Sequence, residues 1–144
     1  MQKVNIGIIG LGGIGGLLAV LLKNNGHEIF SSRKNKNYRT LILRSNYYGQ
    51  TRANIKFDKT LKDAKIIFVC SKYPYLKSHL KNIKNTKALI VPFLNGLSHI
   101  EILKKKFGNR LLISTIGKVV SKKKIKSNII IHESKNKPEV LIFL

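Results

Sequence analysis

A run of glycines near the start of the chain has the residue types and spacing that could bind a diphosphate. The run fits the pattern G-x-G-x-x-G and reads Gly10-Leu11-Gly12-Gly13-Ile14-Gly15. In this pattern Gly10 allows a tight turn, Gly12 lets a diphosphate approach the backbone, and Gly15 lets the following helix pack closely. The diphosphate would lie on the free N–H groups at the positive end of that helix. A turn without a ligand is the alternative, but a strand pattern before it and a helix pattern after it favour a dinucleotide site.

The residues about 20 positions beyond the glycines distinguish the two common dinucleotides. An NAD site normally places Asp or Glu there, to bind the ribose hydroxyls. This chain instead has two hydroxyl side chains and two cations, Ser31-Ser32-Arg33-Lys34. Such residues suit a 2′-phosphate, so we expect NADP(H) as the cofactor. The alternative is that Arg33 and Lys34 are ordinary surface cations in a lysine-rich protein.

Two further polar residues follow apolar runs that we expect to be strands. Lys72 follows the run at 66–70, and Asn95 follows the run at 88–94. Because ligands of parallel α/β sheets bind beyond the carboxyl ends of the strands, both residues are candidates for the same site as the glycines. An ammonium can stabilise negative charge, and an asparagine can hold an amide or a hydroxyl. A solvated lysine and a common Asn-Gly turn are the alternatives.

Strand-like and helix-like patterns alternate along most of the chain. A fully apolar strand is expected at 4–9, a helix with one apolar stripe at 13–24, and a second strand at 28–30. Further strands are expected at 66–70, 88–94 and 111–116, with helices that begin near 74 and 98. This order predicts a Rossmann-like, doubly wound α/β fold: a mostly parallel sheet with helices on both faces. Two apolar runs at 129–131 and 140–144 predict antiparallel strands at the C-terminal end.

Four local patterns lead to weaker expectations. Residues 38–57 have the composition of short strands around a turn. Thr60 and Asp63 have the spacing of a helix start, and Ser98 and Glu101 have the spacing of a capping box. Gly108 is expected to end the helix that follows Ser98.

The composition is that of one basic globular domain. The 144 residues suffice for one domain with a core, and 43% of them are hydrophobic. The formal net charge is +22, but the lysines are scattered, with runs only at 104–106 and 122–124 and no interleaved aromatics. We therefore expect solvated faces and weak, salt-sensitive binding to polyanions, with no specific nucleic-acid partner.

The remaining composition signals concern compartment and metals. The single cysteine, Cys70, fits a reducing cytoplasm and is expected to be a small core residue rather than a nucleophile. The four histidines lack metal-ligand spacing, so no metal site is expected. The first strand begins too early to leave room for a signal peptide, and no apolar run is long enough to span a membrane. We therefore expect a cytoplasmic location and no membrane partner.

The glycine motif combines with two later segments, in this order and spacing, to give a resemblance. The segments are Val69-Cys70-Ser71-Lys72 and Leu94-Asn95-Gly96. Together the three resemble the N-terminal domain of ketopantoate reductases (2-dehydropantoate 2-reductases), over nearly the whole chain. The resemblance implies NADPH-dependent reduction of 2-dehydropantoate, a 2-oxo acid, to pantoate in pantothenate biosynthesis. It also implies that Gly10 to Gly15 cradle the diphosphate, that Arg33 meets the 2′-phosphate, and that Lys72 and Asn95 line the nicotinamide and substrate side.

The chain also departs from the family pattern. Members commonly continue the lysine segment with Gln-Thr, where this chain has Tyr75-Leu76, and often have alanine near Ser121 or Lys122. The family has a second, helical domain that carries the general-acid lysine, so Lys72 and Asn95 would have supporting catalytic roles. We therefore expect residues 1–144 to form a single dinucleotide-binding domain without that helical domain. A helical partner, or self-association through the apolar run 140–144, would then cover the exposed surface.

Two other functions remain open from the sequence. One is a non-catalytic NADP-binding or polyanion-binding Rossmann module, and the other is a reductase of another 2-oxo acid. The residues that would choose the substrate lie, by the resemblance, mainly in the helical domain.

Overall fold

The computed structural model describes residues 1–32, 40–85 and 87–143. Its centre is a five-stranded sheet in which every strand runs parallel to its neighbours. The strand order is β5(Lys56–Phe57), β2(Glu28–Ser31), β1(Asn5–Ile9), β6(Ile66–Val69) and β7(Leu89–Pro92). The carboxyl ends of β1, β2 and β6 therefore meet at one edge of the sheet, where the α/β rule places a ligand.

The first unit of the fold is β1, helix α1(Gly13–Asn24) and β2, as the sequence predicts. The predicted bounds of the helix are confirmed, while β1 begins one residue later than expected and β2 extends to Ser31. The helix ends because the Asn25 side chain donates a hydrogen bond to the Leu21 carbonyl at 2.7 Å and Gly26 has a φ of +93°.

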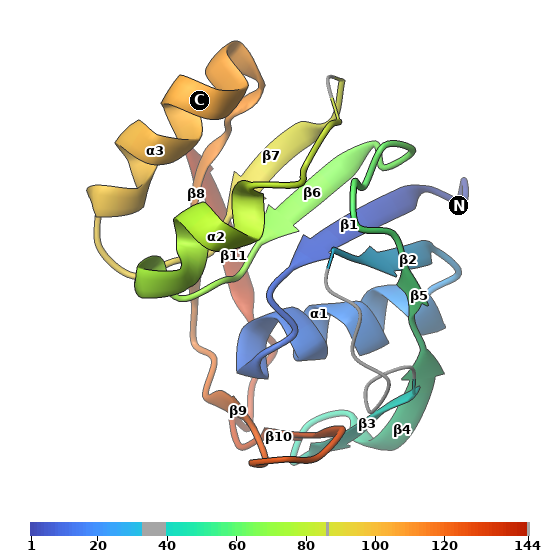
Figure 1. The fold of residues 1–144 in the computed structure, drawn as a ribbon. Helices are drawn as coiled ribbons and strands as arrows, with labels where there is room; N and C mark the ends of the chain where they lie inside the picture. Colours follow the sequence, from blue (N-terminus) through green and yellow to red (C-terminus); the bar gives the residue numbers. More distant parts are fainter. Residues whose placement is uncertain (33–39, 86, 144) are drawn as a thin grey trace.

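A second sheet covers the outer side of α1, so that this helix lies between two sheets (Figure 1). Its strand order is β4(Gly49–Asn54), β3(Thr40–Ser45), β10(Ile129–His132) and β9(Ser121–Lys123). Strands β3 and β4 form an antiparallel hairpin, which confirms short strands around a turn within the predicted range 38–57. The end of that range, β5, pairs with β2 instead, and residues 38 and 39 lie outside the described residues. The parallel pairing of β3 with β10, and the existence of β9, are not evident from the sequence.

The other face of the central sheet is covered by short helices (Figure 1). A 3-10 turn, η2(Tyr73–Tyr75), leads into α2(Leu76–Leu80), and Pro74 lies in its first turn as predicted. Helix α3(Ser98–Phe107) ends at Gly108, as predicted, and continues into the 3-10 turn η3(Gly108–Arg110).

The core consists of two hydrophobic clusters, one on each face of the central sheet. Ile8 belongs to the cluster with α1 and the second sheet, whereas its neighbour Ile9 belongs to the cluster with α2 and α3. Successive strand side chains point to opposite faces, so a strand buried on both sides must be apolar at every position. This arrangement confirms the predicted fold class. The antiparallel strands are not confined to the C-terminal end, because β3 and β4 also pair in this way.

A two-stranded antiparallel ribbon completes the described fold. Strand β8(Ile113–Gly117) pairs with β11(Glu139–Phe143), the last described element. All the apolar side chains of β11 are exposed, namely Val140, Leu141, Ile142 and Phe143. The sequence-based expectation of an exposed apolar run is therefore confirmed for residues 140–143, while self-association stays a prediction.

Two predicted local features are wrong. No helix starts at Thr60: its N–H and hydroxyl both donate to Asp58 Oδ1, and Leu61 has a φ of +52°. The buried Asn85 amide also donates to the carbonyls of this loop at Leu61, Lys62 and Ala64, which leaves them unavailable to a helix. The capping box at Ser98 is wrong as well, because Leu97 occupies the cap position and no side chain caps α3.

Within the described ranges, no helix is long and apolar enough to cross a membrane. In the same ranges, no group of three His, Cys, Asp or Glu side chains gathers where a metal ion could bind.

Candidate functional site

Two glycines of the motif allow β1 to turn sharply and α1 to approach it. Gly10 has a φ of +91°, and a methyl group added to it would lie 2.7 Å from the Ser71 backbone nitrogen. A methyl group added to Gly15 would overlap the Gly10 carbonyl oxygen. Both positions therefore require glycine for backbone reasons, and the close packing expected at Gly15 is confirmed.

Gly12 differs from these two because open space surrounds it. A methyl group added to Gly12 would meet no atom within 4 Å. Gly12 is the N-cap of α1, its carbonyl accepts the first helical hydrogen bond from Gly16 at 2.8 Å, and no side chain caps the helix. The first N–H groups of α1 thus start from a loop that leaves room for a ligand against the backbone.

This loop borders a pocket of about 460 Å³ at the carboxyl ends of β1, β2 and β6. Its wall combines backbone, hydroxyl groups, two ammonium groups and an imidazole. The lining residues are Gly10, Leu11, Gly12, Ser31, Ser32, Cys70, Ser71, Lys72, Tyr75, His79 and Lys123. None of these described lining residues is acidic, so the chemistry of the wall favours an anionic ligand.

The structure brings only part of the predicted site together. Gly10, Leu11, Gly12 and Lys72 line the pocket, as do the serines at the end of β2. Gly13, Ile14 and Gly15 belong to the first turn of α1 and are not lining residues. Asn95 is exposed in the loop after β7, at the same edge of the sheet but outside the pocket lining. Arg33, like Lys34, lies outside the described residues.

The acid that β2 does carry, Glu28, lies at the opposite end of that strand. It pairs in register with Asn5, at the start of β1, three residues before the pocket serine Ser31. Its carboxylate accepts ion pairs from Lys3, Lys23 and Lys56 at 3.0, 3.0 and 2.9 Å. Hydrogen bonds from these lysines, that from Lys56 first, lower the pKa of Glu28 to about 2. Glu28 is therefore not a ribose-binding acid.

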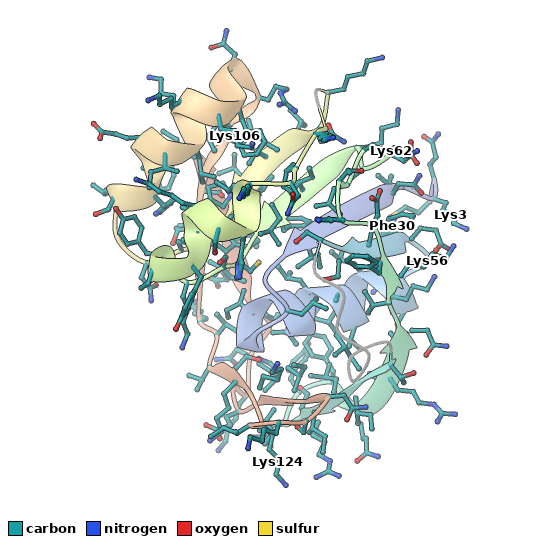
Figure 2. All side chains as sticks on the ribbon, viewed as in Figure 1. Lys3, Phe30, Lys56, Lys62, Lys106 and Lys124 are labelled. Carbon is teal, nitrogen blue, oxygen red and sulfur yellow. The ribbon has the colours of Figure 1, made fainter. Side chains whose placement is uncertain are left out.

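Figure 2 shows Lys3 and Lys56 on the same side of the molecule, Lys106 in its upper part beside α3, and Lys124 at its lower end. The surface cations are thus dispersed, as the scattered lysines of the sequence suggest, and the acid-free pocket lies apart from the cluster around Glu28.

Several pocket residues were given no role in the sequence analysis. Ser71 Oγ lies 2.5 Å from His79 Nδ1, and the His79 ring stacks on Tyr75 with centroids 6.1 Å apart. The spacing of four residues between Tyr75 and His79 after Pro74 is a signal for this contact, because it places both on one side of a helical turn. Lys123 was part of a lysine run assigned to a solvated face, yet it lines the pocket.

The cysteine at the pocket is not a nucleophile. Burial raises the pKa of Cys70 to about 12, so its sulfur stays a neutral thiol at physiological pH. The expected core position is wrong, because Cys70 is half-buried at the pocket wall and belongs to neither core cluster.

The fold and the position of the pocket define the chain as a Rossmann-like α/β domain with a candidate ligand site at the switch between β1 and β6. The sequence matches the family described as ketopantoate reductase PanE/ApbA over residues 6–139. The chain therefore belongs to the ketopantoate reductase family, as the resemblance predicted.

Solved structures share the fold at low sequence identity. A 2-dehydropantoate 2-reductase from Geobacter metallireducens GS-15 superposes with a TM-score of 0.79 and 17% identity, covering 97% of this chain and 49% of that chain. A 2-dehydropantoate 2-reductase from Methylococcus capsulatus gives a TM-score of 0.78 and 16% identity, covering 96% and 48%. D-mandelate dehydrogenase, solved with NADH and anilino(oxo)acetate, gives 0.75 and 15%, covering 94% and 47%.

This chain thus spans about half the length of the structures it matches. No curated protein matches its sequence significantly.

Proposed function

We propose that this chain supplies the cofactor-binding domain for NADPH-dependent reduction of 2-dehydropantoate to pantoate in the cytoplasm. The observation that carries the proposal is the pocket itself. It lies at the carboxyl edge of the parallel sheet, contains two lysines and no described acid, and is bordered by a glycine loop with open space at Gly12. Membership of the ketopantoate reductase family supports the reaction class.

The residues of the chain would bind and orient the cofactor. The backbone of Gly10 to Gly12 and the N–H groups of α1 would hold the diphosphate. When bound, NADPH supplies the hydride that reduces the ketone. Lys72, at the end of β6, would place an ammonium beside the bound anion, and Asn95, after β7, would hold the nicotinamide or substrate side by hydrogen bonds.

The choice of NADPH over NADH rests on the end of β2. Ser31 and Ser32 line the pocket there, and neither is an acid that would bind the ribose hydroxyls. The two cations that follow in the sequence, Arg33 and Lys34, would neutralise a 2′-phosphate.

Calorimetric titration with NADPH and NADH at moderate salt tests the proposal. We expect saturable binding, tighter for NADPH, that is lost in Gly12→Val because the added side chain would fill the space of the diphosphate. Arg33→Ala should weaken NADPH more than NADH. Absence of saturable binding by the wild-type chain would refute the cofactor site. Binding of nucleotides no tighter than binding of heparin would instead favour a polyanion-binding module.

The likeness to D-mandelate dehydrogenase favours a second candidate, reduction of another 2-oxo acid. With NADPH bound, titration with 2-dehydropantoate and with phenylglyoxylate separates the two substrates. We expect a heat of binding only with 2-dehydropantoate. If the substrate contacts come from a further domain, we expect a heat of binding with neither acid. A response to phenylglyoxylate alone would support the second candidate.

We also propose that a helical domain, on this polypeptide or another, supplies the general acid. The exposed apolar ribbon formed by β8 and β11 is the surface that it would cover, since Leu141 and Phe143 are 57% and 58% exposed.

A further inference from the structure

We propose that Lys123, on β9 of the second sheet, binds the diphosphate of the dinucleotide. The inference rests on the proposed function and adds a cofactor contact from a sheet that lies outside the glycine motif. Three observations support the inference: the packing of β9 against α1, the alternation of side chains along β9, and the absence of acids from the described pocket wall.

Strand β9 is fixed directly to the start of α1. Ser121 Oγ donates a hydrogen bond to the Gly13 carbonyl at 2.8 Å. A methyl group added to Gly13 would overlap the Ser121 carbonyl, and one added to Gly16 would overlap the Ile130 side chain on the paired strand β10. These two glycines thus let the second sheet approach the first turn of the helix, where the diphosphate would lie.

Side chains along β9 alternate between the side that faces α1 and the pocket and the side that faces solvent. Ser121 faces α1, and Lys123, two residues on, is half-buried and lines the pocket. Lys122, between them, is 64% exposed at its side chain and forms an ion pair with Glu133 at 2.8 Å. Only one of two adjacent lysines therefore faces the pocket.

The electrostatics of the pocket give the Lys123 ammonium a ligand-binding role. Lys72 and Lys123 reach the pocket from different sheets, and no described acid lines it. A bound anion would therefore meet two cations in a partly enclosed site, where charge-assisted hydrogen bonds are strong. Because β9 is joined to Gly13, next to the glycine loop, the diphosphate is the group that Lys123 would meet.

The test compares Lys123→Ala with Lys122→Ala, a matched loss of one charge on the same strand. Affinities for NADPH, NADH and ADP-ribose are measured by calorimetry at fixed salt, and ADP-ribose lacks both the 2′-phosphate and the nicotinamide. We expect Lys123→Ala to weaken all three by about tenfold or more, and Lys122→Ala to stay within about twofold of wild type. Lys123→Arg should recover most of the affinity.

The other outcomes are equally decisive. Equal effects of the two alanine variants would overturn the inference. Loss of NADPH affinity alone would place Lys123 at the 2′-phosphate and refute the diphosphate assignment. If Lys123→Ala melts at a lower temperature than Lys122→Ala, Lys123→Met, which keeps the apolar stem, replaces it in the same comparison. Tight wild-type binding together with an unaffected Lys123→Met would refute this inference alone, whereas failure of the wild type to bind would refute the proposed function with it.

Discussion

The cations at the two ends of the central sheet have opposite surroundings. At the amino end, Lys3, Lys23 and Lys56 converge on Glu28, so the chain neutralises these charges with its own carboxylate. At the carboxyl end, Lys72 and Lys123 line a pocket in which no described residue is acidic. In a chain with 28 cations and only six acids, the position of an acid is informative. The first arrangement is a closed structural cluster, whereas the second has the acid-free lining that the proposed anionic ligand requires.

The comparison also explains why net charge alone is a poor guide to function in this protein. A formal charge of +22 suggests nucleic acid, yet the lysines labelled in Figure 2 are dispersed over the surface. Local geometry, and not the total, separates a lysine that meets solvent from one that lines a pocket.

The largest expected effect separates two glycines at the carboxyl end. Gly15→Ala should destabilise the fold by about 3 kcal/mol or more, because the added methyl group overlaps the Gly10 carbonyl. Gly12→Ala should change stability by less than about 1 kcal/mol, since its methyl group meets open space. Urea unfolding of both variants measures the difference. Similar losses in both would mean that the loop is packed differently from this description.

The next effect comes from placing an acid in the acid-free pocket. Ser32→Asp should weaken NADPH binding by roughly tenfold or more, because the new carboxylate repels a 2′-phosphate at the end of β2. NADH should bind about as well as before or better, since an acid at this place can accept hydrogen bonds from the ribose hydroxyls. Ser32→Asn, which has the same shape without the charge, is the control in the titrations. Equal weakening of NADPH by both variants would argue against the electrostatic explanation.

A smaller effect is expected at the amino end. Glu28→Gln should lower stability by about 1 kcal/mol at pH 7 and leave NADPH affinity unchanged. Because folding lowers the pKa of Glu28 from 4.5 to about 2, its contribution is fully present above pH 4.5 and is lost as the pH falls toward 2. Denaturant melts between pH 2 and 7 should show this loss in the wild type and a flatter profile in the variant. A change in NADPH affinity would contradict the separation of the two ends.

The smallest effect concerns His132, on β10 and away from both ends. The ring is buried, its Nδ1 lies 2.8 Å from Ser45 Oγ, and desolvation lowers its pKa below 6.5. The imidazole is neutral in the folded protein and binds a proton more readily in the unfolded chain. The free energy of unfolding therefore decreases as the pH falls below 6.5. Thermal melts should show that the wild type is modestly less stable at pH 5.5 than at pH 7, and that this difference is smaller in His132→Gln. An unchanged pH dependence in this variant would assign the loss elsewhere, for example to His99, whose pKa burial also lowers.

The sequence predicts the first β-α-β unit well because its signals are local. Apolar continuity in β1, one apolar stripe in α1 and glycines at both ends of the helix all act within 20 residues. The loop at Thr60 shows the limit of such signals: its capping spacing is overridden by Asn85, which lies more than 20 residues away and bonds to the loop carbonyls.

The second sheet and its contribution to the pocket could not be predicted for the same reason. Strand β3 pairs with β10 across nearly 90 residues, and the three-residue β9 has no apolar pattern of its own. Whether Lys122 or Lys123 faces the pocket depends on the register of β9 against β10, which no local pattern encodes. Lys72 was found from the sequence because it lies just beyond an apolar strand, and Asn95 shows that this position alone does not bring a side chain into the pocket.

The most direct test of the account is a ¹⁵N-resolved NMR titration of the wild-type chain with NADPH at moderate salt. We predict saturable shifts of the backbone amides at the carboxyl end, in Gly10, Gly12, Ser32, Lys72 and Lys123, with the amides around Glu28 unchanged. Shifts that fail to saturate, or that spread over the dispersed lysines and the Glu28 cluster, would contradict the assignment of the carboxyl end as the anion site.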